Sequence, residues 1–292
     1  MDRRRDVDRR YRRHCRAGRR IPQDGVVAAL PGRQARTLIA LARDAGLAVT
    51  AHHVDHGIRA ESHDDAERAR AIADRLDVRF ELHTVDVDRG PNLEARAREA
   101  RRRTLPPDAA TGHTADDQAE TVLLRLVRGS GSGGLGAMRP GPTHPILALR
   151  RTDTAAVCRS LGITPVHDAS NDRPDMWRNR IRAEALPLLT DIAGRDLVPI
   201  LERTAGLLRD DSEFLDRLAA GIDPTDALAV ADAPTVLARR AIRCWLLDAG
   251  YPPDAAAVDR VLAVARGTVV ACELPGGRRV ERSNQRLRVV GG

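Results

Sequence analysis

The sequence contains no lysine, so all 48 of its basic residues are arginine. Chemistry that depends on a lysine side chain of the protein itself is therefore excluded, and any positively charged site must be built from guanidinium groups. Aromatic residues make up only 2% of the chain. Stacking of single-stranded bases on aromatic rings is consequently not expected as the main binding mode.

Paired cysteines and long apolar runs are also missing. The four cysteines, at positions 15, 158, 244 and 272, are far apart in the sequence and show no paired spacing. They indicate neither a disulfide framework nor a cysteine zinc site. No apolar run approaches the roughly 18 residues that cross a bilayer, and the charged N-terminus lacks the apolar region of a signal peptide. We expect a cytoplasmic protein with no membrane contact.

What the chain does have is enough apolar content to fold and a strongly basic start. Its 292 residues, 42% of them hydrophobic, suffice for one large domain or two ordinary ones. Residues 1–24 hold ten arginines against four aspartates, so +6 of the net charge of +7 lies there. Such a basic tail could attract phosphate backbones, or it could be a solvated, disordered extension.

Apolar runs alternate with helical patterns through the first half of the chain. We expect strands near 26–30, 47–57 and 78–87, separated by helices at 37–46 and 61–77 and followed by a helix at 92–103. This alternation predicts an α/β fold with a parallel sheet covered by helices on both faces. Further along, 108–114 could end another strand, 114–129 reads as a helix capped by Thr114 and stopped by Gly129, and 144–153 reads as another helix.

The sequence pattern changes near residue 191, where we expect short helices joined by polar connectors. The last 25 residues predict paired strands across a Pro-Gly-Gly turn. We therefore predict a disordered basic tail at 1–24, a nucleotide-binding catalytic domain at 25–190 and a smaller, mainly helical C-terminal domain at 191–292.

Two histidine- or glycine-rich stretches have competing interpretations. HHVDHG, at 52–57, ends a predicted strand, but alternate strand residues face opposite sides, so a metal site within it is less favoured than a ligand crevice or a plain turn. GSGSGG, at 129–134, matches a dinucleotide fingerprint by spacing, yet it follows a helix instead of a strand. It is better explained as a flexible connector or a mobile loop over a site.

The densest polar cluster is GHTADDQAET, at 112–121. Acidic residues at a helix start complement the helix dipole, but capping alone does not require a histidine, two aspartates, a glutamine and a glutamate together. At the edge of a nucleotide crevice an acid could hold a metal ion and a histidine could contact phosphate. A second cluster, WRNRIR at 177–182, is either a solvated helix face or a contact with nucleic-acid phosphates.

The order of these motifs resembles that of bacterial tRNA(Ile)-lysidine synthases, members of the PP-loop ATP pyrophosphatases with an adenine nucleotide alpha-hydrolase-like fold. The segments that carry the resemblance are HHVDHGIR, NLEARAREAR, TGHTADDQAETVLLRLVRGSGSGGLGAM, HPILALRR and DASNDRPDMWRNRIRAEALPLL. The resemblance implies a ligase that uses ATP and Mg²⁺ to adenylate C2 of cytidine 34 in the CAU anticodon of tRNA(Ile). Free L-lysine then displaces AMP, and decoding changes from AUG to AUA.

The resemblance also implies roles for individual residues. The expected catalytic set is His113, Asp116, Asp117, Gln118 and Glu120, with Asp117 as a Mg²⁺ ligand. The expected ATP-binding set is Gly32, His52, His56, Gly57, Arg128, Gly129, Ser130 and Gly131. The expected tRNA-binding set is Arg178, Asn179 and Arg182, and the C-terminal domain at 191–292 is expected to contact the tRNA as well. The partners are tRNA(Ile) and lysine, and a homodimer is among the assemblies that the resemblance allows.

The chain departs from the family at the phosphate loop. Where the family has Ser-Gly-Gly-x-Asp-Ser, residues 31–36 read PGRQAR, so only Gly32 matches. Ala35 lacks the carboxylate that would help to hold Mg²⁺, and Arg33 replaces a glycine where the backbone should approach phosphate. Three explanations stay open: an active synthase with a rebuilt loop, a catalytically impaired relative that binds tRNA, and a frameshift upstream of Thr37.

Overall fold

The computed structural model describes residues 26–28, 33–55, 62–86, 93–162, 177–248 and 253–291. The predicted tail at 1–24 and three residues of the expected ATP-binding set, Gly32, His56 and Gly57, lie outside these ranges. The chain divides into two compact units, Met1–Ala205 and Gly206–Gly292. This division falls inside one helix, and the domain boundary expected near 190 stays a prediction.

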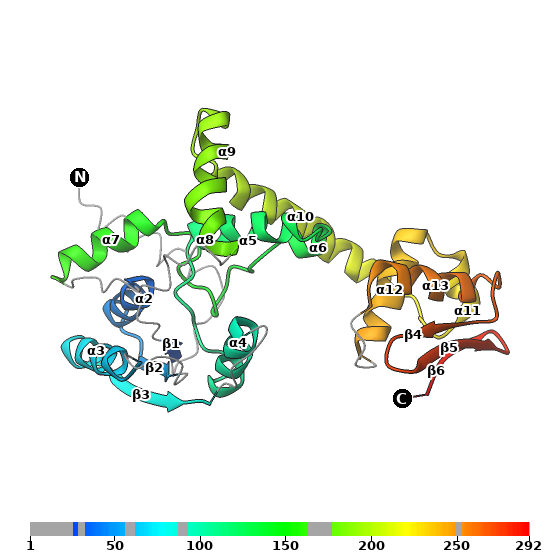
Figure 1. The fold of residues 1–292 in the computed structure, drawn as a ribbon, viewed down its shortest axis with the longest axis horizontal. Helices are drawn as coiled ribbons and strands as arrows, with labels where there is room; N and C mark the ends of the chain where they lie inside the picture. The colour runs from blue at the N-terminus through cyan, green and yellow to red at the C-terminus, as the bar shows by residue number, and fades with distance from the viewer. Residues whose placement is uncertain are drawn as a thin grey trace. The chain divides into compact units, whose positions relative to one another are not determined.

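The first unit is built on a parallel sheet, as the alternating pattern predicts. Strands β1 (Val26–Ala28), β2 (Thr50–Asp55) and β3 (Arg79–Thr84) lie in the order β1-β2-β3, connected by helices α2 (Arg33–Asp44) and α3 (Ser62–Arg75). Helix α4 (Leu93–Thr104) follows β3. Figure 1 shows these elements together in blue to green.

Helices cover the two faces of this sheet unequally. Leu38 of α2, Ala73 of α3 and Ala51 of β2 belong to one buried cluster, which explains the helical spacing of small apolar residues in 61–77. On the opposite face, Val54 packs against Leu105 and Ala109, directly after α4. Side chains that alternate along β2 therefore enter two different environments, one against α2 and α3 and one against the end of α4.

The rest of the first unit is helical. It contains α5 (Ala115–Val127), α6 (Ser132–Leu135), α7 (Arg151–Ser160), α8 (Trp177–Arg180), the π-helical segment η2 (Ile181–Ala185), α9 (Leu186–Ala193) and the start of α10 (Val198–Ala219). The expected helix at 144–153 is wrong in its first half, because 144–150 forms turns and the helix begins at Arg151. The expected strand at 108–114 is reduced to a single bridge residue at Ala110.

The second unit is mainly helical with a small sheet. Helices α11 (Ala227–Asp232), α12 (Thr235–Asp248) and α13 (Ala255–Ala265) precede strands β4 (Ala271–Leu274), β5 (Arg278–Ser283) and β6 (Arg286–Val290). The three strands are antiparallel in the order β4-β5-β6, so the hairpin across the Pro-Gly-Gly turn is confirmed. Fully buried residues such as Ile242, Val261 and Val280 form its core. Among the described residues, no helix is long and apolar enough to cross a membrane.

Candidate active site

Helix α5 begins where the sequence predicts, and Asp117 explains why. The backbone N–H and the hydroxyl of Thr114 both donate to Asp117 Oδ2, at 2.9 and 2.7 Å. This exchange between the residue before the helix and its third residue is a capping interaction, and both side chains are buried. At the other end, Gly129 has φ +74°, a conformation that favours glycine, and the helix stops.

Asp116, the residue before Asp117, links the start of α5 to the start of α7. The Arg150 guanidinium donates to both of its carboxylate oxygens, at 3.0 and 3.2 Å, and the backbone N–H of Arg151 donates at 2.8 Å. Arg150 also contacts Asp196. Asp116 therefore has a structural role that is fully satisfied by partners 34 and 35 positions away in the sequence.

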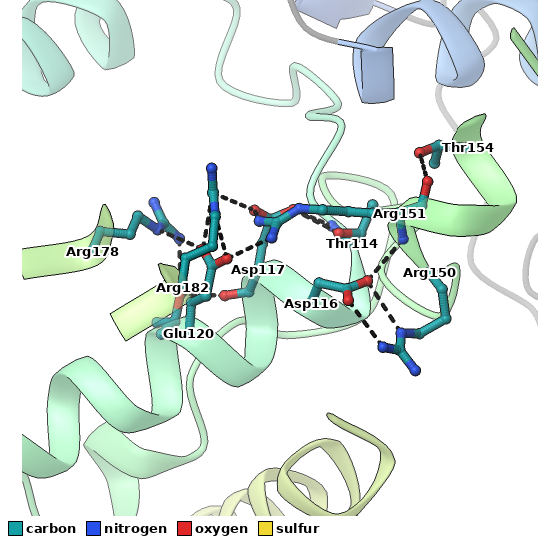
Figure 2. A network of polar contacts seen from close by, with 10 residues as sticks. Thr114, Asp116, Asp117, Glu120, Arg150, Arg151, Thr154, Arg178 and Arg182 are labelled. Carbon is teal, nitrogen blue, oxygen red and sulfur yellow. Dashed lines mark hydrogen bonds and ion pairs between the residues drawn. The ribbon is translucent and has the colours of Figure 1, made fainter. Parts of the chain in front are cut away.

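Glu120 is the centre of a buried ion cluster (Figure 2). Its side chain has no exposed surface and accepts from Arg151 Nη1 at 2.6 Å and from Arg182 Nε at 2.7 Å. Arg178 Nε lies 3.4 Å from its second oxygen. Arg151 reaches across to Asp117 Oδ1 at 2.5 Å, so one guanidinium joins two turns of the helix. Figure 2 shows the acids on α5 and the arginines arriving from α7, α8 and η2.

The electrostatics of the cluster favour the charged forms of Asp117 and Arg151. Burial disfavours the ionised form of Asp117, but the charge of Arg151 and the hydrogen bonds from Thr114 outweigh it and lower the pKa of Asp117 to about 2. Burial likewise disfavours charged Arg151, yet its contacts with Glu120 and Asp117 raise the pKa of that guanidinium. Because Asp116, Asp117, Glu120 and Asp196 face four arginines, the cluster is balanced.

This balance matters for the metal role expected of Asp117. Its Oδ2 already accepts two hydrogen bonds from Thr114, and its Oδ1 faces the Arg151 guanidinium. Mg²⁺ prefers oxygen ligands that carry uncompensated negative charge. In this geometry Asp117 does not fit a Mg²⁺ ligand, and we derive no step through a metal ion there.

Gln118 and His113 have different surroundings. The Gln118 amide, which is buried, donates to the backbone oxygen of Met138 at 3.0 Å and accepts from its N–H at 2.9 Å, so it fixes the segment after α6. The Thr111 hydroxyl donates to Thr143 O at 3.0 Å and lies 2.7 Å from His113 Nδ1. Since that hydroxyl has only one hydrogen, Nδ1 of His113 is the donor, and Nε2 accepts in the neutral ring.

Gly112 places this motif against the phosphate-loop region. A Cβ at Gly112 would lie 2.7 Å from the backbone nitrogen of Ala35 and 2.8 Å from the carbonyl carbon of Gln34. The backbone before α5 therefore touches the first turn of α2, which is formed by the second half of the altered stretch 31–36. That first turn contains no acidic residue, and a helix N-terminus favours anions. His113 is thus held beside a positively polarised helix start.

The structure separates the remaining predicted residues from this point. Arg128, Gly129, Ser130 and Gly131 lie at the far end of α5, on the order of 20 Å from His113 at 1.5 Å per residue. Arg128 stacks over Trp177, with its guanidinium carbon 5.5 Å from the ring centroid. His52 lies within β2, 2.8 Å from His83, and Asn179 lies in α8. Among the described residues, the structure brings Asp117, Glu120, Arg178 and Arg182 together, and it places Arg128, Gly129, Ser130 and Gly131 at the opposite end of α5 from His113.

Two central residues, Arg150 and Arg151, were not predicted for the site. The segment HPILALRR supported the resemblance, but nothing in it indicated ion pairs with α5. The available signal was the acidic excess at 116–120, which requires counter-charges once it is buried. Only the tertiary fold shows which arginines supply them.

A parallel sheet covered by helices, with a polar cluster at a helix start beside the loop region, defines the class as a PP-loop protein. The PP-loop domain family model matches residues 34–189, starting halfway through the altered loop at 31–36. The fold is similar to that of a U34-tRNA thiolase from Methanococcus maripaludis with a [4Fe-4S] cluster, at TM-score 0.57 and 14% identity, covering 70% of this chain and 78% of that one.

Curated relatives narrow the class. The chain is 40% identical to the tRNA(Ile)-lysidine synthase of Nocardia farcinica over 90% of this chain and 87% of the relative. It is 39% identical to that of Rhodococcus erythropolis over 82% and 76%, and 41% identical to that of Mycolicibacterium paratuberculosis over 78% and 78%. The chain belongs to the tRNA(Ile)-lysidine synthase family, a family of ligases.

Proposed function

We propose that this protein joins L-lysine to C2 of cytidine 34 in the CAU anticodon of tRNA(Ile), through an intermediate adenylated by ATP. The observation that carries the proposal is the 40% identity to a synthase of that name over nine tenths of the chain. The fold adds a parallel sheet whose first helix starts without an acidic residue, beside His113. The absence of lysine from the protein is harmless, because lysine is the substrate.

The proposed contribution of the protein is positioning and charge neutralisation. In-line attack on phosphorus needs no protein nucleophile, so held geometry and positive charge supply the rate enhancement. The triphosphate would lie at the start of α2, where the helix N-terminus attracts anions. His113, with Nδ1 engaged by Thr111, would donate from Nε2 to a phosphate oxygen in its protonated form, in which both ring nitrogens carry hydrogen. Mg²⁺ would travel with the phosphates of ATP, without Asp117 as its ligand.

In this proposal the acids of α5 act through the arginines. Asp117 and Glu120 hold the Arg151 guanidinium, and Asp116 holds the Arg150 guanidinium and the backbone N–H of Arg151. The cluster thereby fixes α5 against α7 and keeps His113 at the start of α2. The side chains of Arg178 and Arg182 are about one third exposed at most, and both pair with Glu120. We propose that their exposed parts contact tRNA phosphates.

A second candidate function follows from the first turn of α2. Ala35 and Arg36 stand where the family has an aspartate and a serine, and their side chains are 1% and 4% exposed. Neither offers a carboxylate or a hydroxyl to a nucleotide. This favours a catalytically impaired relative that binds tRNA. The two functions differ in ATP dependence, because the impaired relative would bind the tRNA equally with and without ATP.

Pyrophosphate release tests the proposal. The purified full chain is mixed with ATP, Mg²⁺ and a CAU-anticodon tRNA(Ile), first without lysine and then with it. We expect tRNA-dependent pyrophosphate release that continues over many turnovers only when lysine is present, because lysine frees the adenylated tRNA. Binding of the tRNA without any pyrophosphate release would support the impaired relative. A tRNA(Met) with the same anticodon is the control for the tRNA body.

A further inference from the structure

A group of metal-ligating side chains lies on the sheet, away from the acidic cluster. It consists of His52 on β2 and of Glu81 and His83 on β3, whose ligand atoms all lie within 4.8 Å of one another. In the parallel pairing, His52 is opposite Glu81 and Val54 is opposite His83. Residues 52, 81 and 83 therefore share the face on which Val54 packs against Leu105 and Ala109.

We propose that His52, Glu81 and His83 bind a divalent transition-metal ion of borderline softness, with Zn²⁺ as the fitting ion. Two imidazoles and one carboxylate are ligands that Zn²⁺ takes, and three protein ligands leave a fourth position for water. Mg²⁺ is not favoured, because it prefers all-oxygen ligands. Within the motif 52–57, only His52 is a proposed ligand. The other two ligands, Glu81 and His83, come from the neighbouring strand and not from the remaining histidines of the motif.

The distances between the ligand atoms suit one shared ion. His52 Nδ1 lies 2.8 Å from His83 Nε2 and 3.6 Å from Glu81 Oε2. Ligand atoms about 2.05 Å from a tetrahedral metal lie about 3.3 Å apart, between these two values. The imidazole planes differ by 8°, and the two rings would turn relative to one another for both nitrogens to face one ion. The hydrogen shared by the two nitrogens moves to the far nitrogen of its own ring, and both rings remain neutral.

The surroundings also suit a bound ion. His52 is 5% exposed, whereas the Glu81 side chain is 34% exposed, so the group has a buried floor and a solvent-facing side. Arg79 Nη2 lies 2.9 Å from Glu81 Oε1 in an ion pair, and Oε2 faces His52 as the ligand oxygen. Such an outer contact orients a ligating carboxylate. Because Arg79 is 75% exposed, its opposing charge is screened by water.

Binding would clamp β2 to β3. Any ion that binds the folded chain and not the unfolded chain stabilises it by mass action. The expected role is structural, and it is independent of the proposed ligase function. It also assigns His52 to the ion, in place of the adenosine contact implied by the family resemblance.

Cobalt titration of the full chain tests the site. The purified protein is stripped with a chelator and titrated with Co²⁺, whose visible absorption reports tetrahedral nitrogen and oxygen ligands. We expect about one Co²⁺ per chain, displacement by Zn²⁺ and a Tm that rises with Zn²⁺. His83→Gln and, separately, Glu81→Gln should weaken Co²⁺ binding at least tenfold and remove the Zn²⁺-dependent rise in Tm. Both positions are partly exposed, and circular dichroism verifies folding.

The matched control is His144→Gln, which removes one ring of the other histidine pair, His113 and His144, whose centroids are 5.3 Å apart. The control should keep the Co²⁺ spectrum of the parent chain. The proposal is overturned if no absorption develops at millimolar Co²⁺, or if His83→Gln and Glu81→Gln leave binding unchanged. It is equally overturned if the spectrum is lost in His144→Gln and kept in His83→Gln.

Discussion

At the scale of single residues, the positions of the acids on α5 are explained by the arginines that pair with them. The composition of 112–121 predicts a cluster with more than a capping role, and the structure buries two of its acids, Asp117 and Glu120. The identity of their partners could not be predicted, because Arg151 and Arg182 lie 31 and 62 positions further along the chain. Ion pairs between residues so far apart in the sequence depend on how the helices pack, and the periodicity of the sequence does not indicate that packing.

Glu120→Gln should destabilise the protein strongly. The change leaves Arg151, Arg178 and Arg182 without their shared counter-charge, and breaking a buried ion pair costs about 3 kcal/mol when the partners keep some exposure. Chemical denaturation of the variant should show this loss. Glu184→Gln is the matched control, since its pair with Arg180 is exposed and four residues away on one helix. Equal stability of the two variants would contradict the buried cluster.

Asp117 should contribute acid sensitivity. Its folded pKa of about 2 lies below the ordinary value of 3.8, so its stabilisation is present above pH 4 and is lost as the pH falls from 4 to 2. The contribution is on the order of 2 kcal/mol. Urea midpoints measured across this range should fall less steeply in Asp117→Asn than in the parent chain.

Asp223 provides the control for that pH profile. Its pKa is also lowered to about 2, by Thr225 and Arg286, but its side chain is exposed and its pairing is screened. Asp223→Asn should therefore change the acid limb much less than Asp117→Asn. A parent-like profile in the Asp117 variant would show that the buried contacts do not hold its carboxylate.

At the scale of elements, the residues at helix ends explain why the sequence predicts the bounds of α5 correctly and the start of α7 too early. Thr114 and Gly129 mark the ends of α5 in the sequence, and the structure confirms both. The segment 144–150 has apolar residues at helical spacing, yet Pro145 and the bonds from His144 to Gly141 make turns there. Asp153 accepts from the backbone of Arg150 at 3.0 Å and starts the helix at Arg151. Local capping outweighs the apolar pattern.

The contact between residues 112 and 35 gives a prediction at this scale. Gly112→Ala places a methyl group 2.7 Å from the backbone nitrogen of Ala35, so α2 or the TGHT segment must shift. We expect about 1–3 kcal/mol of destabilisation, as for overpacked cores, together with weaker ATP binding. Urea denaturation and calorimetric titration with ATP measure the two effects.

Gly206→Ala, within α10, is the control for the glycine change. Nothing lies within 4 Å of a Cβ at that position, and alanine favours a helix over glycine by up to about 1 kcal/mol. The variant should be as stable as the parent chain or more stable, with unchanged ATP binding. A neutral Gly112→Ala would contradict the close approach of the two segments.

At the scale of the whole molecule, the motif order predicts the family, and the fold class follows from it. The parallel first sheet and the antiparallel C-terminal strands agree with the sequence patterns, whereas the altered loop at 31–36 lies only partly in the described residues. Net charge also belongs to this scale. Outside residues 1–24 the chain carries +1 in total, because 38 arginines face 37 acids. Contact with tRNA is therefore expected to be patchy.

Affinity for tRNA should accordingly depend on salt. Each phosphate neutralised by an arginine releases counter-ions, so the dissociation constant rises with salt concentration. Filter binding between about 50 and 200 mM salt should give a clear negative slope of log affinity against log salt. An affinity that stays constant over this range would contradict arginine–phosphate contact.

The central claim, that this chain is a working lysidine synthase despite PGRQAR at 31–36, is tested most directly by lysine transfer. Labelled L-lysine, ATP, Mg²⁺ and a CAU-anticodon tRNA(Ile) are incubated with the full chain, and label in the tRNA is counted. We predict ATP-dependent incorporation at cytidine 34, abolished when that position is uridine. Bound tRNA with no label incorporated would contradict the claim and leave a tRNA-binding relative of the family.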